Sequence, residues 1–234
     1  FIAENIMLLK LLQAYAEEKG IEAYFLFLDM EKAFDRASWE YLHAALRELG
    51  FDDSFLSYVT LAYSTDHPPT RQLHVNGFLG PSFPILSGVA QGCPLSPLLF
   101  LAITEAFTRL IVTDTHIRGI LVNGVNHKIS QFADDSTLKL LPDDTPRAEA
   151  HIVTWCEASA MRENNNKREG LLIGALRHHP ERAPTGVVAG EAWTPPGKSI
   201  RALGVPMGND LDENEWWLTR YRTVKGAIAR WKST

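Results

Sequence analysis

Apolar residues recur at helical spacing in several stretches of the chain. Between residues 4 and 18 they share one helical face, formed by Ile6, Leu9, Leu12 (or Gln13) and Ala16, and Gly20 follows as a stop signal. Similar patterns predict helices over residues 39–49, 53–63, 97–113 and 147–162, and a closing helix whose apolar face runs from Trp217 to Trp231. Ser38 is positioned to cap the helix predicted over residues 39–49.

Other stretches have the pattern of strands. "AYFLFLD", residues 23–29, is a continuous apolar run that ends in a carboxylate, which is typical of a strand buried on both faces. Asn76-Gly77 and Asn123-Gly124 lie between apolar residues and predict tight hairpin turns. The Pro- and Gly-rich segment 174–198 is expected to form loops with a short strand.

The segment 129–141 predicts a strand, a turn and a second strand, with Asp134 and Asp135 near the turn. One interpretation is that the Asp pair simply fills the turn, because Asp tolerates turn dihedrals and bonds its own backbone. The other is that these carboxylates converge with Asp29 on a hard cation such as Mg²⁺, provided that the two strands are neighbours. The pattern alone leaves both interpretations open.

Composition places the chain among globular proteins. Its 234 residues are 45% hydrophobic, enough for one large domain or two small ones. We expect an intracellular protein, nuclear or cytoplasmic, with no membrane partner, because no run approaches about 18 apolar residues and no secretory signal opens the chain. Cys93 and Cys156 lie far apart and support neither a disulfide framework nor a zinc site, and His178 and His179 are expected to be polar loop residues.

The distribution of charge gives two opposed indications. A net charge of -5 argues mildly against a nucleic-acid partner, which is usually bound through many Lys and Arg contacts to phosphate. Residues 218–234, however, contain five basic residues and no acidic one. That end of the chain either faces a polyanion or is a solvated helix face.

Three stretches, in this order, look like the core motifs of a reverse transcriptase: "FLDMEKAFDRASWEYL" (27–42), "GVAQGCPLSPLLF" (88–100) and "FADD" (132–135). The amino-acid sequence of these motifs most resembles that of the non-LTR (LINE-type) retrotransposon enzymes, since a group II intron enzyme would more often have Gly in place of Cys93. "SAMRENNNKREGLLIG" (159–174) resembles the family's following Asn-x-x-Lys segment, and "RALGVPMG" (201–208) its Leu-Gly hairpin.

The resemblance implies an α+β fold: a polymerase palm with an antiparallel βαββαβ-like sheet covered by helices on one face. It implies partial fingers at 1–22, a palm at 23–173 with fingers-side elements inserted at about 51–85, a variable loop and primer-grip-like hairpin at 174–213, and the start of a thumb at 214–234. The implied partners are an RNA template, a DNA primer and dNTP, with two Mg²⁺ ions (Mn²⁺ as a substitute). The parent protein could carry an endonuclease domain upstream.

The resemblance also assigns roles to residues of the acidic motifs. Asp29 and Asp134 would bind both metal ions, Asp135 would complete the acidic cluster, and the Met30 carbonyl would be a further ligand. Phe34 would contact the nucleotide sugar and exclude ribonucleotides.

Further roles fall on the later motifs. Gln91 would contact the incoming nucleotide, and Gly92 would allow its backbone to approach closely. Lys167 would donate a proton to pyrophosphate or hold its charge, unless it is an ordinary exposed lysine. Leu203 and Gly204 would belong to a hairpin that grips the primer.

The sequence departs from the family pattern at two positions: Ala160 replaces a usual Gly, and Arg168 replaces a usual Thr. By comparison with the family we also expect the fingers to be shortened and the thumb to be cut. The leading hypothesis is therefore an RNA-directed DNA polymerase domain. One alternative is an inactive retroelement remnant that folds or binds RNA. A group II intron maturase relative is a second, which Cys93 in the Gln-Gly-Cys motif disfavours. An RNA-dependent RNA polymerase is a third, which Phe34 disfavours.

Overall fold

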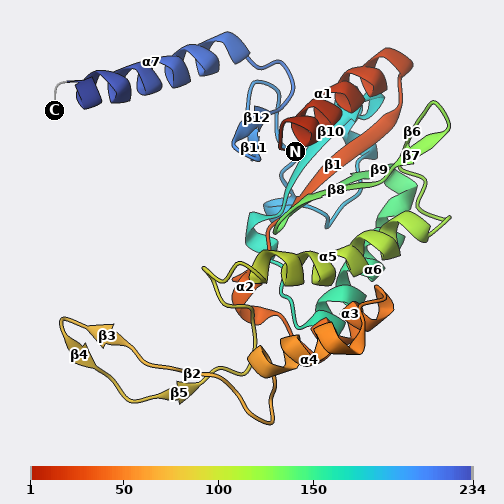
Figure 1. Cartoon of the computed structure of the whole chain (residues 1–234). Helices are drawn as coiled ribbons and strands as arrows, with labels where there is room; N and C mark the ends of the chain where they lie inside the picture. Colours follow the sequence, from red (N-terminus) through yellow and green to blue (C-terminus); the bar gives the residue numbers. More distant parts are fainter. Residues whose placement is uncertain (1, 233–234) are drawn as a thin grey trace.

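A four-stranded antiparallel sheet forms the centre of the computed structural model, which describes residues 2–232 (Figure 1). Its strand order is β10-β1-β9-β8. The strands are β1 (Glu22–Leu28), β8 (Ile129–Phe132), β9 (Asp135–Leu140) and β10 (Glu169–Gly174). The chain order of these strands and of the long helices between them is βαββαβ, as expected for a polymerase palm.

Strand β1 is the central element of the core. It pairs with β10 on one side and with β9 on the other. Tyr24 and Leu26 are buried in one hydrophobic cluster, whereas Ala23 and Phe25, which point the opposite way, are buried in a second. The prediction of a strand buried on both faces is confirmed.

Helices cover both faces of the sheet, so the expectation of helices on one face was wrong. One face shares a hydrophobic cluster with α3 (Trp39–Glu48), α4 (Asp53–Ala62), α5 (Ser96–Thr113) and α6 (Thr145–Ser159), and α4 packs on α3. The other packs against α1 (Ile2–Lys19) and the hairpin of β11 (Ile200–Ala202) and β12 (Val205–Met207). In Figure 1, α1 lies above the sheet and α5 below it. An amphipathic pattern shows that a helix buries one side, but not against which surface.

Helix α5 bears on the expectation that no segment spans a membrane, although its 18 residues include Glu105 and Arg109. It is long and apolar enough, by length and mean composition, to cross a membrane. Its buried residues, among them Phe100, Ile103 and Phe107, pack into the core beneath the sheet. The core helix of a globular protein satisfies the same two criteria, so this helix is weak evidence for a membrane span.

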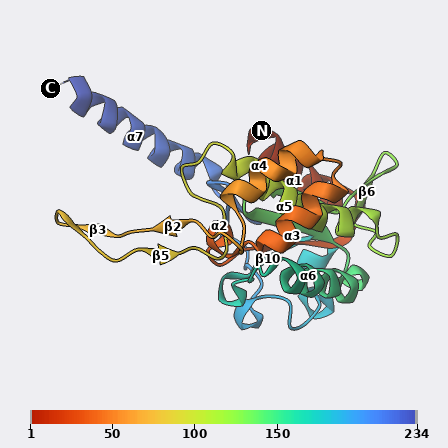
Figure 2. The same ribbon diagram turned by 60° about the horizontal axis from the view of Figure 1, so that its bottom comes forward.

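Two elements project from the same side of the molecule (Figures 1 and 2). The first is a long arm made of two short ladders, in which β2 (Thr70–Arg71) pairs with β5 (Phe83–Pro84) and β3 (His74–Val75) pairs with β4 (Phe78–Leu79). The predicted turn at Asn76 and Gly77 forms its tip, with both residues at positive φ. The second is α7 (Glu213–Lys232).

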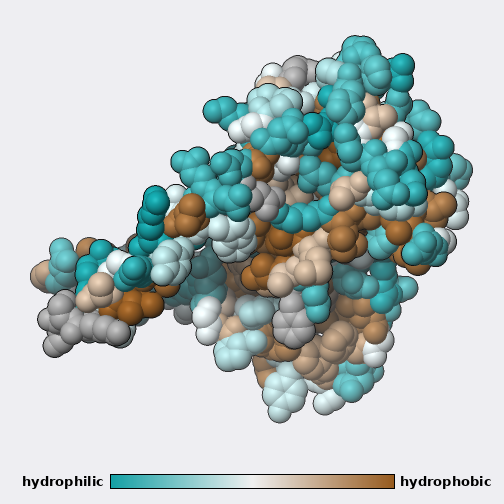
Figure 3. Space-filling view, turned by 90° about the horizontal axis from the view of Figure 1, so that it is seen from above, coloured by the Kyte–Doolittle hydropathy of each residue, from teal (hydrophilic) through white to brown (hydrophobic). Residues whose placement is uncertain are grey.

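The predicted apolar face of α7 is exposed. Trp217, Tyr221 and Val224 are each more than half exposed, and basic side chains lie among them, with Lys225 over the Tyr221 ring. Seen from above, the projecting part of the molecule carries apolar and hydrophilic atoms side by side (Figure 3).

The remaining elements are short. They are α2 (Ala33–Arg36), a hairpin of β6 (Ile120–Val122) and β7 (Val125–His127), and five 3-10 helices: η1 (Pro142–Asp144), η2 (Asn165–Lys167), η3 (Ala175–His178), η4 (Pro180–Arg182) and η5 (Ala189–Glu191). The short strand expected within 174–198 was wrong, because 3-10 turns occupy this segment between β10 and β11. The helix expected over 147–162 ends at Ser159, because Ala160 adopts a left-handed conformation with φ 59°.

Candidate active site

Two adjacent strands bring three carboxylates to one edge of the sheet. Leu28, the last residue of β1, lies opposite Ser136 of β9, and Asp29 follows it directly. Strands β8 and β9 are joined by the two-residue turn Ala133–Asp134, with Phe132 paired to Asp135. Because β1 and β9 are neighbours, the end of β1 and the β8–β9 turn meet at the same edge.

The carboxylates influence one another electrostatically. Burial raises the pKa of Asp135, and the negative charges of Asp134 and Asp29 raise it further. The Lys167 ammonium nitrogen lies 3.4 Å from a carboxylate oxygen of Asp29. Lys167 is thus a cation directly beside the acidic cluster, as the sequence hypothesis requires.

The donor set fits a hard divalent cation in chemistry, since all three side chains offer carboxylate oxygens. Within residues 2–232, no group of three or more His, Cys, Asp or Glu side chains is arranged to hold a metal ion by itself. Mg²⁺ is usually held by one or two carboxylates, with water and substrate phosphates completing its octahedron. The assignment of Asp29, Asp134 and Asp135 as metal ligands stays a prediction, and these residues suit that mode of binding.

Met30, the residue after Asp29, is held by the segment that precedes Lys167. It lies opposite Glu163 in an isolated β-bridge. The Glu31 amide donates to the Arg162 carbonyl oxygen at 2.8 Å, and the Asn164 amide donates to the Asp29 carbonyl oxygen at 2.8 Å. Neither bond uses the carbonyl oxygen of Met30.

The tip of the β11–β12 hairpin faces the Asp turn. Leu203 and Gly204 form this tip, with φ values of 47° and 84°. Together with Asp134 and Asp135 they line a cavity of about 390 Å³. A second cavity, of about 400 Å³, runs from Asp29 and Lys167 to Arg201 and Leu203. The structure therefore brings the predicted primer-grip residues to the predicted metal ligands.

Phe34 and Gln91 line one cavity, of about 470 Å³, together with Gly92 and Cys93. The Phe34 ring also stacks on Phe100, with centroids 4.5 Å apart and an angle of 17° between the planes. Gly92 has φ 87°, and a Cβ added there would meet no heavy atom within 4 Å. Glycine at this position therefore serves the backbone conformation.

A second glycine, Gly88, was missed as a site residue by the sequence interpretation. It has φ 83°, and a Cβ there would lie 2.6 Å from the carbonyl oxygens of Phe34 and Asp35. Its own carbonyl oxygen accepts a 2.7 Å hydrogen bond from the indole of Trp39. Gly88 is the first residue of the sequence motif that contains Gln91, so the sequence does point to this segment. Only the fold shows that Gly88 contacts the backbone of Phe34 and Asp35.

The cysteines and the His pair lie outside this cluster. Both cysteines are free; burial and then the charge of Glu163 raise the pKa of the Cys156 thiol to about 11. His178 pairs with Glu17 at 2.8 Å, and His179 with Glu181 at 3.2 Å. These histidines are at the surface, in ordinary side-chain pairs.

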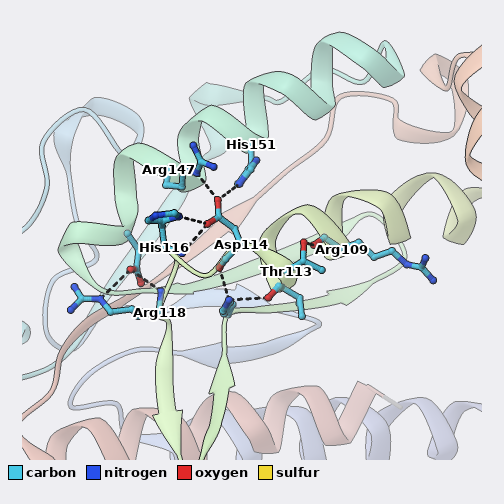
Figure 4. Close-up of polar contacts among 10 residues, drawn as sticks. Arg109, Thr113, Asp114, His116, Arg118, Arg147 and His151 are labelled. Atoms are coloured by element: carbon cyan, nitrogen blue, oxygen red, sulfur yellow. Dashed lines mark hydrogen bonds and ion pairs between the residues drawn. The ribbon is translucent and has the colours of Figure 1, made fainter. Parts of the chain in front are cut away.

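A separate polar cluster surrounds Asp114, at the far end of α5 (Figure 4). The Asp114 carboxylate accepts hydrogen bonds from Arg147 at 2.5 Å and from the ring of His151 at 2.7 Å, both on α6. These contacts, and then the amide of His116, hold the pKa of Asp114 far below its usual range. Since α5 has 18 residues, about 27 Å of helix separate this cluster from Ser96. It joins α5 to α6 and takes no part in the carboxylate site.

Comparison with known proteins bears on what this arrangement does. The family model described as reverse transcriptase (RNA-dependent DNA polymerase) matches residues 2–207. The "Transposon TX1 uncharacterized 149 kDa protein" of Xenopus laevis is 32% identical over 180 residues, which cover 75% of this chain and 13% of that protein. The Pol polyprotein from the type-1 retrotransposable element R2 of Popillia japonica is 29% identical over 206 residues, which cover 86% of this chain and 32% of that protein.

The chain thus spans less than a third of the length of these two relatives. Among solved structures, telomerase from Candida tropicalis in complex with a fragment of telomeric RNA is similar over 73% of this chain and 29% of that chain. The TM-score is 0.50 and the sequence identity is 12%, so this likeness concerns the fold alone.

Proposed function

The chain belongs to the reverse transcriptase (RNA-dependent DNA polymerase) family and is similar to the Pol proteins of non-LTR retrotransposons, and from this premise we propose that it copies RNA into DNA at the carboxylate edge of its sheet. The observation that supports this site is the meeting of Asp29, Asp134 and Asp135 beside Lys167. The reaction transfers a deoxynucleotide from dNTP to a primer 3′-hydroxyl group and releases pyrophosphate.

Asp29 and Asp134 would hold two Mg²⁺ ions, for which Mn²⁺ is a plausible substitute, and Asp135 would complete the cluster. Bound there, the cations supply the positive charge that activates the primer 3′-oxygen and stabilises the departing pyrophosphate. Burial raises the pKa of Asp135, and the charges of Asp134 and Asp29 raise it further; the repulsion among these carboxylates favours cation binding. Lys167 is exposed enough to swing from Asp29 to the pyrophosphate, where its ammonium group would hold charge or give up a proton.

Phe34 and Gln91 would select the nucleotide, because both line one cavity. The Phe34 ring is fixed by its stacking on Phe100, so it could exclude a ribose 2′-hydroxyl group without moving. Gln91 would contact the incoming dNTP. No heavy atom of the protein lies within 4 Å of the position that a Cβ of Gly92 would occupy, so this space is free for the nucleotide.

The template and primer would lie between the two projecting elements. The arm and α7 extend from the same side of the core (Figures 1 and 2), and α7 carries basic side chains that suit a phosphate backbone. We propose that α7 begins the thumb, that the arm is a fingers-side insertion in the palm, and that Leu203 and Gly204 grip the primer.

The test is extension of a labelled DNA primer on an RNA template, with Mg²⁺ and dNTPs. Asp134→Asn removes one proposed ligand charge and should lower the extension rate by at least about 100-fold. Asp143→Asn is the matched control, because Asp143 is an exposed carboxylate on η1 that pairs with Arg118. Equal activity in Asp134→Asn, or no extension by the unmodified chain where a control enzyme works, would contradict the proposal.

A further inference from the structure

Arg168, one of the departures from the family pattern, is a buried cation held by two carboxylates. Its side chain is 9% exposed. One edge of the guanidinium group donates to both carboxylate oxygens of Glu163, at 2.6 and 2.7 Å. Another edge donates to both oxygens of Glu149 on α6, at 2.7 and 3.1 Å, and the Val187 carbonyl oxygen accepts a further bond at 3.2 Å.

These contacts keep Arg168 charged. Burial lowers the pKa of its guanidinium group, but the hydrogen bonds and charges of Glu163 and then of Glu149 raise the pKa, and the net value lies above the ordinary one. Two bidentate pairs on one planar group are an arrangement that only arginine can make, because lysine offers a single ammonium group without a fork.

The Glu163–Arg168 pair closes a short loop, residues 164–167, that ends in Lys167. At its start, the Asn164 amide donates to the Asp29 carbonyl oxygen at 2.8 Å. Within it, the Lys167 amide donates to the Asn164 carbonyl oxygen at 2.8 Å. Lys167 itself is 66% exposed and has a long flexible side chain, so its 3.4 Å approach to Asp29 depends on where this loop holds its backbone.

We infer that Arg168 is a positioning residue for the proposed polymerase site: its paired bonds to Glu163 and Glu149 hold residues 164–167 in the shape that places the Lys167 ammonium group beside Asp29. This inference rests on the proposed function for the role of Lys167. It assigns to Arg168 a task that the usual Thr could not perform, because a hydroxyl group cannot bridge two carboxylates. Glu149 and Glu163 are the partners through which Arg168 acts.

The first measurement is hydrogen exchange, which needs no activity. Arg168→Lys keeps the charge and removes the fork, so the amides of Asn164 and Lys167 should exchange at least about 10-fold faster. Amides of β1, such as those of Phe25 and Leu26, should keep their protection. The inference would be overturned if the amides of residues 164 and 167 kept their protection against exchange, or if the amides of β1 lost protection to the same extent. Arg162→Lys is the matched control, because Arg162 lies on the same segment but is 67% exposed.

The second measurement is single-nucleotide incorporation, and it asks whether Arg168 acts through Lys167. Arg168→Lys should lower kcat by about 10-fold while KM for dNTP changes less than about 2-fold. In a Lys167→Met background, the same substitution should change kcat by less than about 2-fold. An equal fold-loss in both backgrounds would overturn the inference. If the unmodified chain does not extend a primer, the proposed function fails, and the exchange result still decides whether Arg168 holds the loop.

Discussion

The amide of Val89 donates a 2.7 Å hydrogen bond to the carbonyl oxygen of Phe34. The neighbouring Gly88 amide donates to the Ala37 carbonyl oxygen at 2.8 Å. The loop that carries Gln91 is therefore attached by its backbone to the helix that carries Phe34. The two sides of the proposed nucleotide cavity are fixed relative to each other before any nucleotide binds.

Gly88→Ala should break this attachment. The new Cβ would lie 2.6 Å from two carbonyl oxygens and would sit at φ 83°. We expect the free energy of unfolding to fall by about 3 kcal/mol, from steric overlap and left-handed strain together. Gly92→Ala is the matched control, because it has φ 87° but no heavy atom within 4 Å of the added Cβ. It should cost about 1 kcal/mol. If urea unfolding shows that the two variants lose equal free energy of unfolding, the contact of Gly88 with α2 is unimportant.

Ala160→Gly should stabilise the chain. Ala160 ends α6 with φ 59° and ψ 13°, the left-handed conformation that glycine adopts without a Cβ penalty. The relief exceeds the added backbone entropy of glycine in the unfolded state, so we expect a gain of about 0.5–1 kcal/mol. Ala150→Gly, at an exposed position inside the same helix, should instead lose about 1 kcal/mol. Thermal unfolding of both variants would decide, and a lower Tm for Ala160→Gly would contradict the argument.

Lys139 should make stability depend on pH. It is fully buried on β9, where its ammonium group donates to the Ser130 hydroxyl at 2.5 Å, and burial lowers its pKa to about 7. In the unfolded chain a lysine has a pKa of about 10.4. Between these values the unfolded state binds the additional proton, so the contribution of Lys139 to the free energy of unfolding rises as pH rises from about 7 to about 10.4.

Lys139→Met should remove this slope and stabilise the chain at pH 7, by about 2 kcal/mol. Lys128→Met is the contrasting variant, since the buried Lys128 ammonium group bonds the carbonyl oxygens of Val112 and Asp114 at 2.9 and 2.7 Å. Loss of the Lys128 ammonium group should lower the free energy of unfolding by about 1–2 kcal/mol. Urea unfolding of both variants at pH 7 and at pH 10 provides the measurement. A Lys139→Met variant that keeps the full pH slope would rule out Lys139 as its source.

Local features were predictable from the sequence. The uninterrupted apolar run of β1 could be buried only on both faces, and the Asn-Gly pairs at 76–77 and 123–124 adopt the positive φ values that tight hairpins require. The Asp134–Asp135 pair lies at a turn, as the first interpretation expected, whereas cation binding by the pair stays a prediction. Asp134 belongs to a two-residue turn, and the same turn brings the pair to the end of β1.

Relationships across the fold were not predictable. The residue pattern did not locate strand β10, which only the family resemblance implied, because "EGLLIG" is too short for its period to distinguish a strand from a buried helix segment. The role proposed for Arg168 depends on Glu149, which is 19 residues away and meets it only because the fold brings α6 to the residue after η2. Gly88 carries no mark in the sequence that separates it from Gly92, although the two differ in what surrounds them.

The contrast between the Asp turn and the projecting arm has a consequence for how this sequence tolerates insertions and deletions. Ala133 and Asp134 alone connect β8 to β9, so one added residue would shift the register of β9 and move Asp135 away from β1. The arm of residues 70–84 touches solvent along its length, and a longer loop adds little closure entropy. Length variation among related chains should therefore collect in the arm, while the interval from Phe132 to Asp135 stays constant.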